Sequence, residues 1–417
     1  MTMYKFNTVA MIGLGYIGLP TATVLASRGV KVIGVDVNQH AVDTINRGQV
    51  HIVEPDLDGL VHHVVKEGNL VARTTPQEAD AFIIAVPTPF MDGHKPDLSY
   101  IEAAARAIAP VLRQGNLIIL ESTSPVGATE QLAGWLAEYR TDLSFPQQAG
   151  DAADIQLAYC PERVLPGHVL RELVENDRIV GGMTTKAAEM AADLYQIFVR
   201  GECLLTDSRT AEMAKLTENS FRDVNIAFAN ELSLISDKLG INVWELIELA
   251  NRHPRVNILK PGPGVGGHCI AVDPWFIVDS APKEARIIRT AREVNDNKPH
   301  HVIEQVARAA DRFKNPVIAC LGLSFKADID DLRESPAMDI VADLAERDLG
   351  RMLVVEPHID KLPNKLEGKV EFSNAEEAIE QADIVLLLVD HKQFKRVRRE
   401  KLQTRVVIDT RGFFWSR

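Results

Sequence analysis

Patterns typical of buried strands and of helices alternate near the start of the chain. Residues 8–12 form a short apolar run, residues 19–28 have helical periodicity, and residues 31–35 form a second apolar run. Continuous apolar runs indicate strands that are buried on both faces, as in parallel sheets covered by helices. The same patterns predict strands at 81–86, 117–121 and 179–181 and helices at 99–113 and 129–138. A doubly wound α/β domain is therefore predicted for residues 1–200.

The middle of the chain is predicted to be mostly helical. Residues 210–239 contain neither Gly nor Pro, their apolar positions recur at spacings of three and four, and Gly240 follows them. We expect one long helix here. A second helical block spans residues 282–313, with a break expected at Pro299. Residues 201–312 are thus predicted to form a central helical region, whose long helix is the expected homodimer interface.

The alternation of strand and helix patterns returns after Pro316. It predicts elements at 317–321, 337–347, 352–355, 375–381, 384–389 and 406–409. We therefore expect a second, smaller α/β domain with a parallel sheet over residues 313–417. The fold predicted for the whole chain is two Rossmann-like doubly wound domains, joined by a central helical region with one long helix.

Composition indicates a folded enzyme and argues against several kinds of partner. The 417 residues are enough for two or three domains, and 25% of them are charged. A formal net charge of −12 argues against nucleic-acid or anionic-membrane binding, so an anionic substrate requires a local cluster of Arg and Lys. No apolar run approaches membrane-spanning length, and the four cysteines, without a CxxC pair, fit a reducing compartment. We expect a cytoplasmic protein, and we predict no metal site.

The first predicted strand and helix are joined by a GxGxxG motif made of Gly13, Gly15 and Gly18. Glycines at these positions allow a tight turn and the close approach of a pyrophosphate to the helix N-terminus. Asp36 ends the second predicted strand, where a carboxylate accepts hydrogen bonds from a ribose 2′-hydroxyl but repels a 2′-phosphate. The sequence therefore predicts NAD as the cofactor, in preference to NADP.

A glycine-rich turn at residues 262–267 precedes His268 and Cys269. A nicotinamide enzyme that only interconverts an alcohol and a carbonyl needs no nucleophile. A presented thiol therefore predicts that a carbonyl is captured on the protein and that the product is a carboxylic acid. Backbone N–H groups of such a turn, with His268 adjacent, favour a thiolate. The alternative for Cys269 is a buried small hydrophobic residue.

Three polar residues share one face of the expected long helix. Lys215, Asn219 and Arg222 occupy positions i, i+4 and i+7 of that helix. On one face they would supply a proton-transfer group, a neutral donor and an anion clamp to a shared pocket. The alternative is a solvated polar stripe.

Motifs spread over the whole chain resemble the UDP-glucose/GDP-mannose dehydrogenase family. Besides the GxGxxG motif they are AVPTP (85–89), ESTSPVG (121–127), PER (161–163), AEMAKLTEN (211–219), GGHC (266–269) and GLSFK (322–326). Residues 160–167, 251–257 and 268–274 are similar to the branch of the family that acts on N-acetylhexosamines. Many members that oxidise UDP-glucose have serine in place of His268 and lysine in place of Val272, which makes glucose a less favoured substrate.

The resemblance implies a four-electron oxidation. The C6 hydroxyl of UDP-N-acetyl-D-mannosamine would become the uronate with two NAD per sugar, and UDP-N-acetylglucosamine is the alternative because no single residue determines the C2 epimer. Cys269 is implied as the nucleophile that forms a thiohemiacetal and then a thioester, and Lys215, with water and Asp273, as the proton acceptor. The other catalytic residues implied are Glu162 at the hydrolytic water, Asn219 with Lys215 at the oxyanion, and Thr123 as an orienting residue.

The resemblance also implies binding residues. Besides the glycines of the motif and Asp36, the implied NAD contacts are Tyr16, Ile17, Thr88 and Thr129. The implied sugar-nucleotide contacts are Arg163, Val164, Lys215, Asn219, Arg222, His253, Arg255 and Gly266, with Phe325, Lys326, Arg333 and Arg411 from the C-terminal domain. A packed loop residue is the alternative for His253. The implied role is in bacterial surface-polysaccharide synthesis, such as that of enterobacterial common antigen.

Three other functions are alternatives for this sequence. A two-electron hydroxyacid or 6-phosphogluconate-type dehydrogenase leaves the third domain and Cys269 unexplained. A UDP-sugar epimerase normally needs a Tyr-x-x-x-Lys pair, and no tyrosine here is followed by lysine four residues later. A nucleotide-sensing scaffold would bind its ligand without turnover. The number of NADH molecules formed per sugar separates the first alternative from the four-electron reaction.

Overall fold

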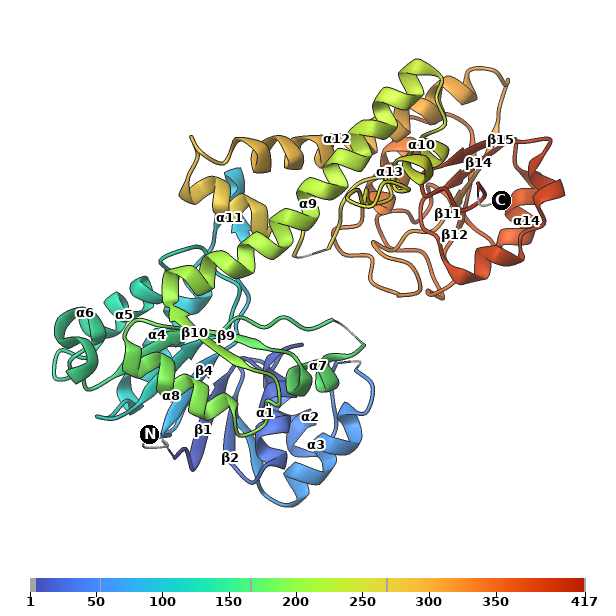
Figure 1. The fold of residues 1–417 in the computed structure, drawn as a ribbon. Coiled ribbons are helices and arrows are strands. Elements are labelled where there is room, and N and C mark those ends of the chain that lie inside the picture. Colours follow the sequence, from blue (N-terminus) through green and yellow to red (C-terminus); the bar gives the residue numbers. More distant parts are fainter. Residues whose placement is uncertain (1–4, 53, 166, 268, 416–417) are drawn as a thin grey trace. The chain divides into compact units, whose positions relative to one another are not determined.

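The computed structural model describes residues 5–52, 54–165, 167–267 and 269–415 of the chain. The chain divides into two compact units, Met1–Glu218 and Asn219–Arg417. Each unit contains a sheet of the Rossmann type, and the long helix α9 (Ser208–Leu239) begins in the first unit and ends in the second (Figure 1). The predicted α/β fold with a central helical region is therefore confirmed. Within the described residues, no helix is long and apolar enough to cross a membrane.

The first unit is built on an eight-stranded sheet with the order β10-β9-β8-β7-β4-β1-β2-β3. Its neighbouring strands are parallel except for β8 and β9, which are antiparallel. The strands are β1 (Thr8–Ile12), β2 (Lys31–Val35), β3 (Leu70–Arg73), β4 (Ala81–Ile84), β7 (Leu117–Leu120), β8 (Gln156–Tyr159), β9 (Arg178–Gly182) and β10 (Cys203–Asp207). The sheet thus continues beyond residue 200, where the sequence pattern indicated the end of the first domain.

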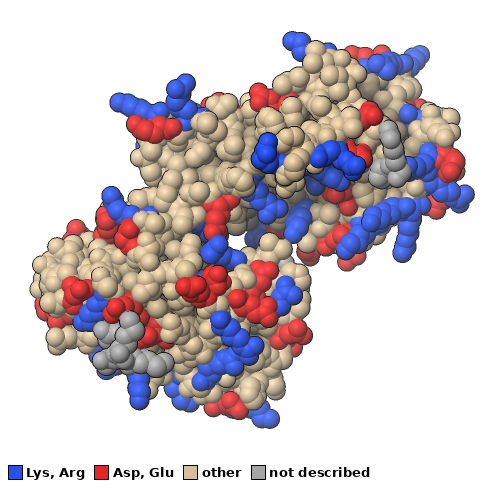
Figure 2. All heavy atoms as spheres, in the orientation of Figure 1, with Lys and Arg blue, Asp and Glu red and all other residues tan. Residues whose placement is uncertain are grey.

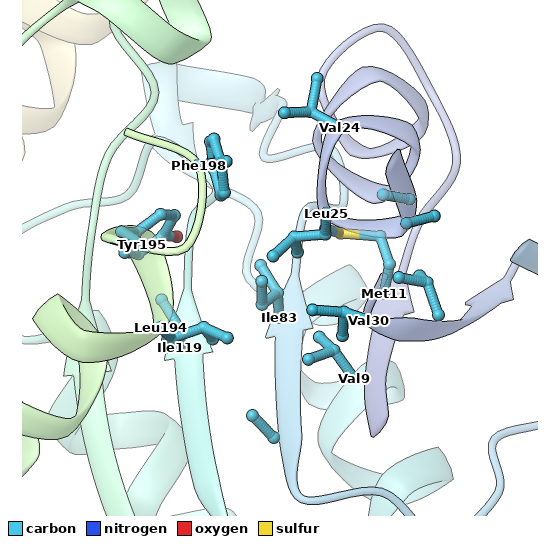
Figure 3. Close-up of a cluster of buried hydrophobic side chains, with 14 of the residues drawn as sticks. Val9, Met11, Val24, Leu25, Val30, Ile83, Ile119, Leu194, Tyr195 and Phe198 are labelled. Carbon is cyan, nitrogen blue, oxygen red and sulfur yellow. The ribbon is translucent and has the colours of Figure 1, made fainter. Parts of the chain in front are cut away.

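Helices cover both faces of this sheet because successive strand residues point to opposite sides. Met11 and Ile83 belong to one core with Leu25 of α1 (Figure 3), whereas Ile12 and Phe82 belong to the core on the other face. The helices are α1 (Gly18–Ser27), α2 (Gln39–Asn46), α3 (Leu57–Lys66), α4 (Ser99–Ile108), α5 (Ala128–Tyr139), α6 (Pro146–Ala149), α7 (Val169–Glu175) and α8 (Thr185–Tyr195), with a small hairpin of β5 (Phe90–Met91) and β6 (Lys95–Pro96). Burial on both faces explains the continuous apolar runs.

The second unit contains a five-stranded parallel sheet with the order β13-β12-β11-β14-β15. Its strands are β11 (Val317–Leu321), β12 (Arg351–Val355), β13 (Glu371–Phe372), β14 (Ile384–Leu387) and β15 (Val406–Asp409). Its helices, besides the end of α9, are α10 (Val243–Ala250), α11 (Asp273–Ser280), α12 (Arg286–Ala310), α13 (Pro336–Glu346) and α14 (Ala375–Gln381). The loop at the carboxyl end of β11 carries the candidate site residues Phe325, Lys326 and Arg333, and Arg411 follows β15.

The break expected at Pro299 is wrong, because α12 continues through that residue. Proline removes one helical N–H···O bond, which normally kinks or ends a helix. Here the turn around Pro299 is bonded to α9: Asn295 Nδ2 donates to the Asp223 carboxylate at 2.7 Å, and Lys298 Nζ donates to Ser233 Oγ at 2.8 Å. These bonds between the two helices, of which the one from Asn295 is buried, offset the local cost of the proline.

Candidate active site

The turn between β1 and α1 has the geometry of a dinucleotide-binding loop. Gly13 has a φ of +94°, and a Cβ added to Gly18 would lie 1.9 Å from the Gly13 carbonyl oxygen. Glycine is therefore required at Gly18, where α1 begins directly against the turn. A Cβ added to Gly15 would meet no atom within 4 Å, so the turn is open there. A bare backbone at a helix N-terminus fits a pyrophosphate, so these residues fit NAD.

Asp36 follows β2 and bonds to this turn. Its Oδ2 accepts a hydrogen bond from the Leu14 N–H, and its Oδ1 accepts one from the Asn38 N–H, both at 2.9 Å. Each carboxylate oxygen has a second acceptor position, and Asp36 is half-buried, so a ribose hydroxyl can still donate to it. The geometry is compatible with the predicted contact to NAD.

Tyr16 links the turn to a more distant loop. Its hydroxyl donates to Glu54 Oε2 at 3.0 Å, and burial together with this carboxylate raises the pKa of Tyr16 to about 12. Glu54 also accepts hydrogen bonds from the N–H groups of Gly167 and Val169. It thereby ties the cofactor turn to the loop that follows β8. No sequence motif marks Glu54, which is buried.

The other three predicted NAD contacts differ in what they offer to a ligand. Ile17 is half-buried immediately before α1, and the Thr88 hydroxyl is buried without a hydrogen-bond partner among the described residues. Thr129 is buried, and its hydroxyl and N–H both donate to Glu212 Oε1, at 2.6 and 2.8 Å. Thr88 is thus able to bond a ligand, whereas Thr129 is already bonded to an acid of α9.

A buried arginine holds the predicted hydrolytic residue Glu162. Glu162 Oε2 accepts from Arg178 Nη2 at 2.7 Å, and Oε1 accepts from the Arg163 N–H at 2.7 Å. Arg178 is only 4% exposed. Its Nη1 lies 3.6 Å from Glu121 Oε1, which also accepts from the Tyr195 hydroxyl at 3.0 Å. Neither Arg178 nor Tyr195 belongs to a recognisable motif, so this network could not be inferred from the sequence.

The network gives Glu121 a pH-dependent effect on stability. Burial, and then the charge of Glu162, raises the pKa of Glu121 from 4.5 to about 8. Between these two values the folded protein retains the proton and the unfolded chain does not, so stability falls as pH rises through this window and is level above it. Glu121→Gln removes this titration. We expect the unfolding temperature of the variant, relative to that of the wild type at the same pH, to increase as pH rises from about 5 to 8.

Differential scanning fluorimetry at a series of pH values measures this difference. The exposed Glu130, changed to Gln, is the control, and its difference from the wild type should stay constant over the same window. A Glu121→Gln curve that runs parallel to the wild-type curve would contradict the prediction.

Cys269 is exposed at the start of a turn that leads into α11. Its carbonyl oxygen accepts from the N–H groups of Val272 and Asp273, at 3.1 and 2.9 Å, and the buried Asp273 carboxylate accepts from Asn219 Nδ2. Asn219 and Asp273, both predicted to be catalytic, are therefore in contact. Asp273 follows Cys269 in the chain by one short turn. Exposure shows that the alternative of a buried hydrophobic cysteine is wrong. His268 lies outside the described residues, so its predicted effect on the thiol stays a prediction.

The three polar residues of α9 are not equally exposed. Lys215 and Asn219 are half-buried and one helical turn apart, whereas Arg222 is exposed. A solvated stripe is therefore wrong for the first two and stays an alternative for Arg222. Thr123 is half-buried in the loop between β7 and α5.

Three residues predicted to bind the sugar nucleotide lie together in the second unit. Phe325, Lys326 and Arg411 line a pocket of about 30 Å³ at the carboxyl ends of β11 and β14. Arg411 Nε donates to Asp390 Oδ1 at 2.9 Å, which fixes its guanidinium at the pocket. Arg333 is exposed and paired with Asp331 at 2.6 Å, outside the residues that line the pocket.

The remaining predicted substrate residues lie on loops. Arg163 pairs with Glu218 at 2.7 Å, and Val164 is half-buried. His253 and Arg255 are exposed, and the Arg255 N–H donates to His253 Nδ1, so the alternative of a packed loop histidine is wrong. Figure 2 shows basic and acidic side chains interspersed on the visible face. Gly266 lies in the glycine-rich turn, where a Cβ would lie 2.3 Å from the Glu334 carbonyl oxygen.

Three segments of the chain match one protein family. Residues 7–199 match the NAD binding domain of the UDP-glucose/GDP-mannose dehydrogenase family, residues 209–297 its central domain, and residues 319–416 its UDP binding domain. The chain is 71% identical over 411 residues to an NDP-N-acetyl-D-galactosaminuronic acid dehydrogenase of Ralstonia nicotianae, covering 99% of this chain and 97% of that protein. It is 65% identical to the UDP-N-acetyl-D-mannosamine dehydrogenase of Campylobacter jejuni, covering 96% and 99%.

A solved structure shares this fold over nearly the full length. It is a UDP-N-acetyl-mannosamine dehydrogenase of S. aureus, with a TM-score of 0.86, 42% sequence identity, and coverage of 98% of this chain and 96% of that one.

Proposed function

Because this chain belongs to the UDP-glucose/GDP-mannose dehydrogenase family, whose NAD binding and UDP binding domains it contains, we propose that it oxidises UDP-N-acetyl-D-mannosamine at C6 to the uronate. The chain is an NAD-dependent oxidoreductase. The observation that carries the proposal is the exposed Cys269 beside the bonded pair Asn219 and Asp273. Relatives named for this sugar, at 62–65% identity, support the mannosamine substrate.

The first half of the proposed reaction makes an aldehyde. Held at the turn between β1 and α1, NAD would supply the hydride acceptor for C6, with one oxidised NAD needed for each of the two oxidations of the sugar. We propose that Lys215 takes the C6 hydroxyl proton through a water that is also bonded to Asp273. Because Asn219 donates to the Asp273 carboxylate, the amide keeps that carboxylate oriented while its other oxygen accepts the water.

The second half of the proposed reaction uses the thiol. The Cys269 thiolate bonds to C6 of the aldehyde, whose oxygen becomes an oxyanion stabilised by Asn219 and Lys215. Loss of a second hydride from C6 leaves a thioester. A water oriented by Thr123 and deprotonated by Glu162 then replaces the sulfur, which releases the uronate and restores the thiol. The bond from Arg178 fixes the position of Glu162 for this step.

The preference for NAD over NADP is proposed to depend on Asp36. In Asp36→Ala the repulsion of a 2′-phosphate is lost, so the ratio of kcat/KM for NAD to that for NADP should fall by about tenfold or more. Asp36→Asn removes the charge but keeps the shape, and should change the ratio in the same direction. Steady-state kinetics with both cofactors measure the ratio. The control is Asp43→Ala in α2, an exposed carboxylate that bonds to Gln39. An unchanged ratio in both Asp36 variants would contradict the assignment.

A second sugar has support of its own. The Ralstonia relative at 71% identity is named for N-acetyl-D-galactosaminuronic acid, so UDP-N-acetyl-D-galactosamine is the second candidate. Purified protein and NAD should be incubated separately with the UDP-activated forms of N-acetylmannosamine, N-acetylgalactosamine, N-acetylglucosamine and glucose. Mass spectrometry and NADH absorbance then give the product and the NADH yield. We expect the uronate from the mannosamine substrate and two NADH per sugar. One NADH per sugar would instead favour a two-electron dehydrogenase.

We propose that the protein is a homodimer through α9. Three of its exposed apolar residues are Phe221, Phe228 and Ile235, with 70%, 51% and 47% of their surface accessible. Their spacing of seven residues puts them on one face of the helix, where a second copy can cover them. Sedimentation velocity measures the mass. A monomer at micromolar concentration would contradict this assembly. The three-domain division at residues 200 and 312 and the cytoplasmic location stay predictions.

A further inference from the structure

In both sheets an acidic side chain bonds to the glycine turn that follows the neighbouring strand, but the two acids differ in how exposed they are. Gly13 after β1 and Gly322 after β11 both have a φ of +94°. Each precedes a leucine whose N–H donates to an acid at the end of the adjacent strand: Asp36 after β2, and Glu356 after β12. Asp36 is half-buried, but Glu356 is only 2% exposed. The acid of the second unit is therefore closed to a ribose.

The second acid, Glu356, is covered by His391. Its Nε2 lies 3.0 Å from Glu356 Oε2, and its ring is fully buried. Glu356 also accepts from the N–H groups of Leu323, Ser324 and His358. Although burial acts to raise it, the bond from His391 and the bonds from the backbone hold the pKa of Glu356 below its usual value. An ionised carboxylate only accepts, so Nε2 of His391 must carry its proton.

The other ring nitrogen of His391 holds the loop at residues 324–335. Nδ1 lies 2.9 Å from the Asp328 nitrogen, and a backbone N–H only donates, so Nδ1 must be the acceptor. Its two partners thus fix one tautomer of the neutral imidazole. Asp328 has a φ of +64°, a strained conformation for a residue with a side chain, and its carboxylate bonds to Lys392 N–H and Nζ. His391 therefore helps to hold a strained turn in place.

This loop carries the pocket and contacts the cysteine loop. Phe325 and Lys326 line the pocket with Arg411, and the Ser324 hydroxyl donates to the Lys326 carbonyl. The loop ends at Glu334, whose carbonyl oxygen accepts from the Gly267 N–H at 3.2 Å. A Cβ on Gly266 would lie 2.3 Å from the same oxygen. A shift of the loop would therefore displace both the pocket residues and the backbone two residues before Cys269.

A metal ion is a less suitable occupant of this region. Ligand atoms of Asp328, His358 and His391 lie within 4.8 Å of one another. Both ring nitrogens of His391 already have partners, however, and the Asp328 carboxylate is bonded to Lys392. A cation would have to break these bonds and displace an ammonium group. The bonds present favour a role in holding the loop.

We propose that His391 is a positioning residue for the UDP-sugar: in its Nε2–H tautomer it bridges Glu356 and the Asp328 N–H, and so holds the loop whose Phe325 and Lys326 bind the nucleotide. This proposal rests on the proposed function only in taking the pocket of Phe325, Lys326 and Arg411 as the UDP site. The residues that line the pocket and the matched UDP binding domain both support that assignment.

Two substitutions distinguish the roles of the two ring nitrogens of His391. The Oδ1 of asparagine lies near the position of Nδ1 and can accept from the Asp328 N–H, whereas the terminal amide of glutamine lies near Nε2 and can donate only to Glu356. Both variants lose the ring contact with Phe394, so lost packing affects them alike. Isothermal titration calorimetry with UDP alone needs no turnover, so a failure of the proposed oxidation does not affect this test. We expect His391→Gln to bind UDP about fivefold more weakly than His391→Asn, the effect of one lost hydrogen bond.

Matched controls are the same two substitutions at His358. Its ring packs beside His391 and bonds to Gln393, so neither variant should change UDP binding, and NAD affinity should not change in any of the four. Hydrogen exchange followed by mass spectrometry should show faster exchange in residues 324–335 of His391→Gln only. Equal UDP affinities of the two His391 variants would overturn the proposal, as would absence of UDP binding to the wild type.

If His391→Gln does not fold, hydrogen exchange of the wild-type protein still tests the proposal. The Asp328 amide should then be protected from exchange in the absence of UDP. Rapid exchange at that amide would overturn the proposal.

Discussion

Cys269→Ser is expected to form no net uronate from UDP-N-acetyl-D-mannosamine and NAD, with a loss in kcat on the order of 10³-fold or more. A serine hydroxyl is far less ionised than a thiol at neutral pH, so it is a much weaker nucleophile toward C6 of the aldehyde. Without a covalent bond to C6, the aldehyde lacks the tetrahedral carbon from which the second hydride leaves. NADH absorbance and mass spectrometry of the sugar nucleotide measure both outcomes.

Binding and a second cysteine provide the controls. Calorimetry should give UDP and NAD affinities within about twofold of the wild type, because serine is close to cysteine in size. Cys203→Ser changes a half-buried cysteine of β10 that is not part of the glycine-rich turn, and it should keep the wild-type rate. If Cys269→Ser still forms two NADH per sugar at the wild-type rate, no covalent step on this residue takes place.

The parts of the fold that were predictable are those that local patterns determine. The strands at residues 8–12, 31–35 and 317–321 were predicted with the bounds that the structure has, because each is apolar apart from Thr8 and Lys31 at the starts of the first two, and each is mostly buried. The long helix was predicted because residues 210–239 lack any helix breaker. The edge strand β15 was predicted as well, but the edge strands β3, β10 and β13 were not. In β10, Leu204 and Leu205 are 43% and 50% exposed, so its burial does not follow the pattern of a central strand.

Tertiary contacts decided what local patterns could not. Pro299 predicts a helix break, but the buried bonds that join α12 to α9 keep the helix continuous. The site shows the same limit. The exposure of Cys269 and the contact of Asp36 with its turn follow from glycine-rich segments close to them in sequence. Glu356 and His391, by contrast, are separated by 35 positions and meet only once the second sheet is formed.

Arg178→Met is expected to be the most destabilising single change in the first unit. Arg178 is 4% exposed, lies 2.7 Å from Glu162, and has its guanidinium carbon 4.5 Å from the centre of the Tyr195 ring. Methionine fills much of the same volume but leaves two acids, Glu121 and Glu162, without the positive charge between them. Removing one partner of a buried ion pair costs about 3–5 kcal/mol, and we expect a loss of that size in the unfolding free energy of this unit.

Urea denaturation at neutral pH measures this loss, with Arg113→Met as the matched control. Arg113 pairs with Asp80 at 2.9 Å, but its side chain is 54% exposed, so its loss should cost less than about 1 kcal/mol. The double variant Arg178→Met with Glu121→Gln should recover part of the loss, because Glu121 has to take up a proton on folding at this pH and glutamine does not. The same arginine also orients Glu162, so the thioester should accumulate in Arg178→Met during turnover. An unfolding free energy of Arg178→Met no lower than that of Arg113→Met would show that the charge of Arg178 does not stabilise the buried acids of this network.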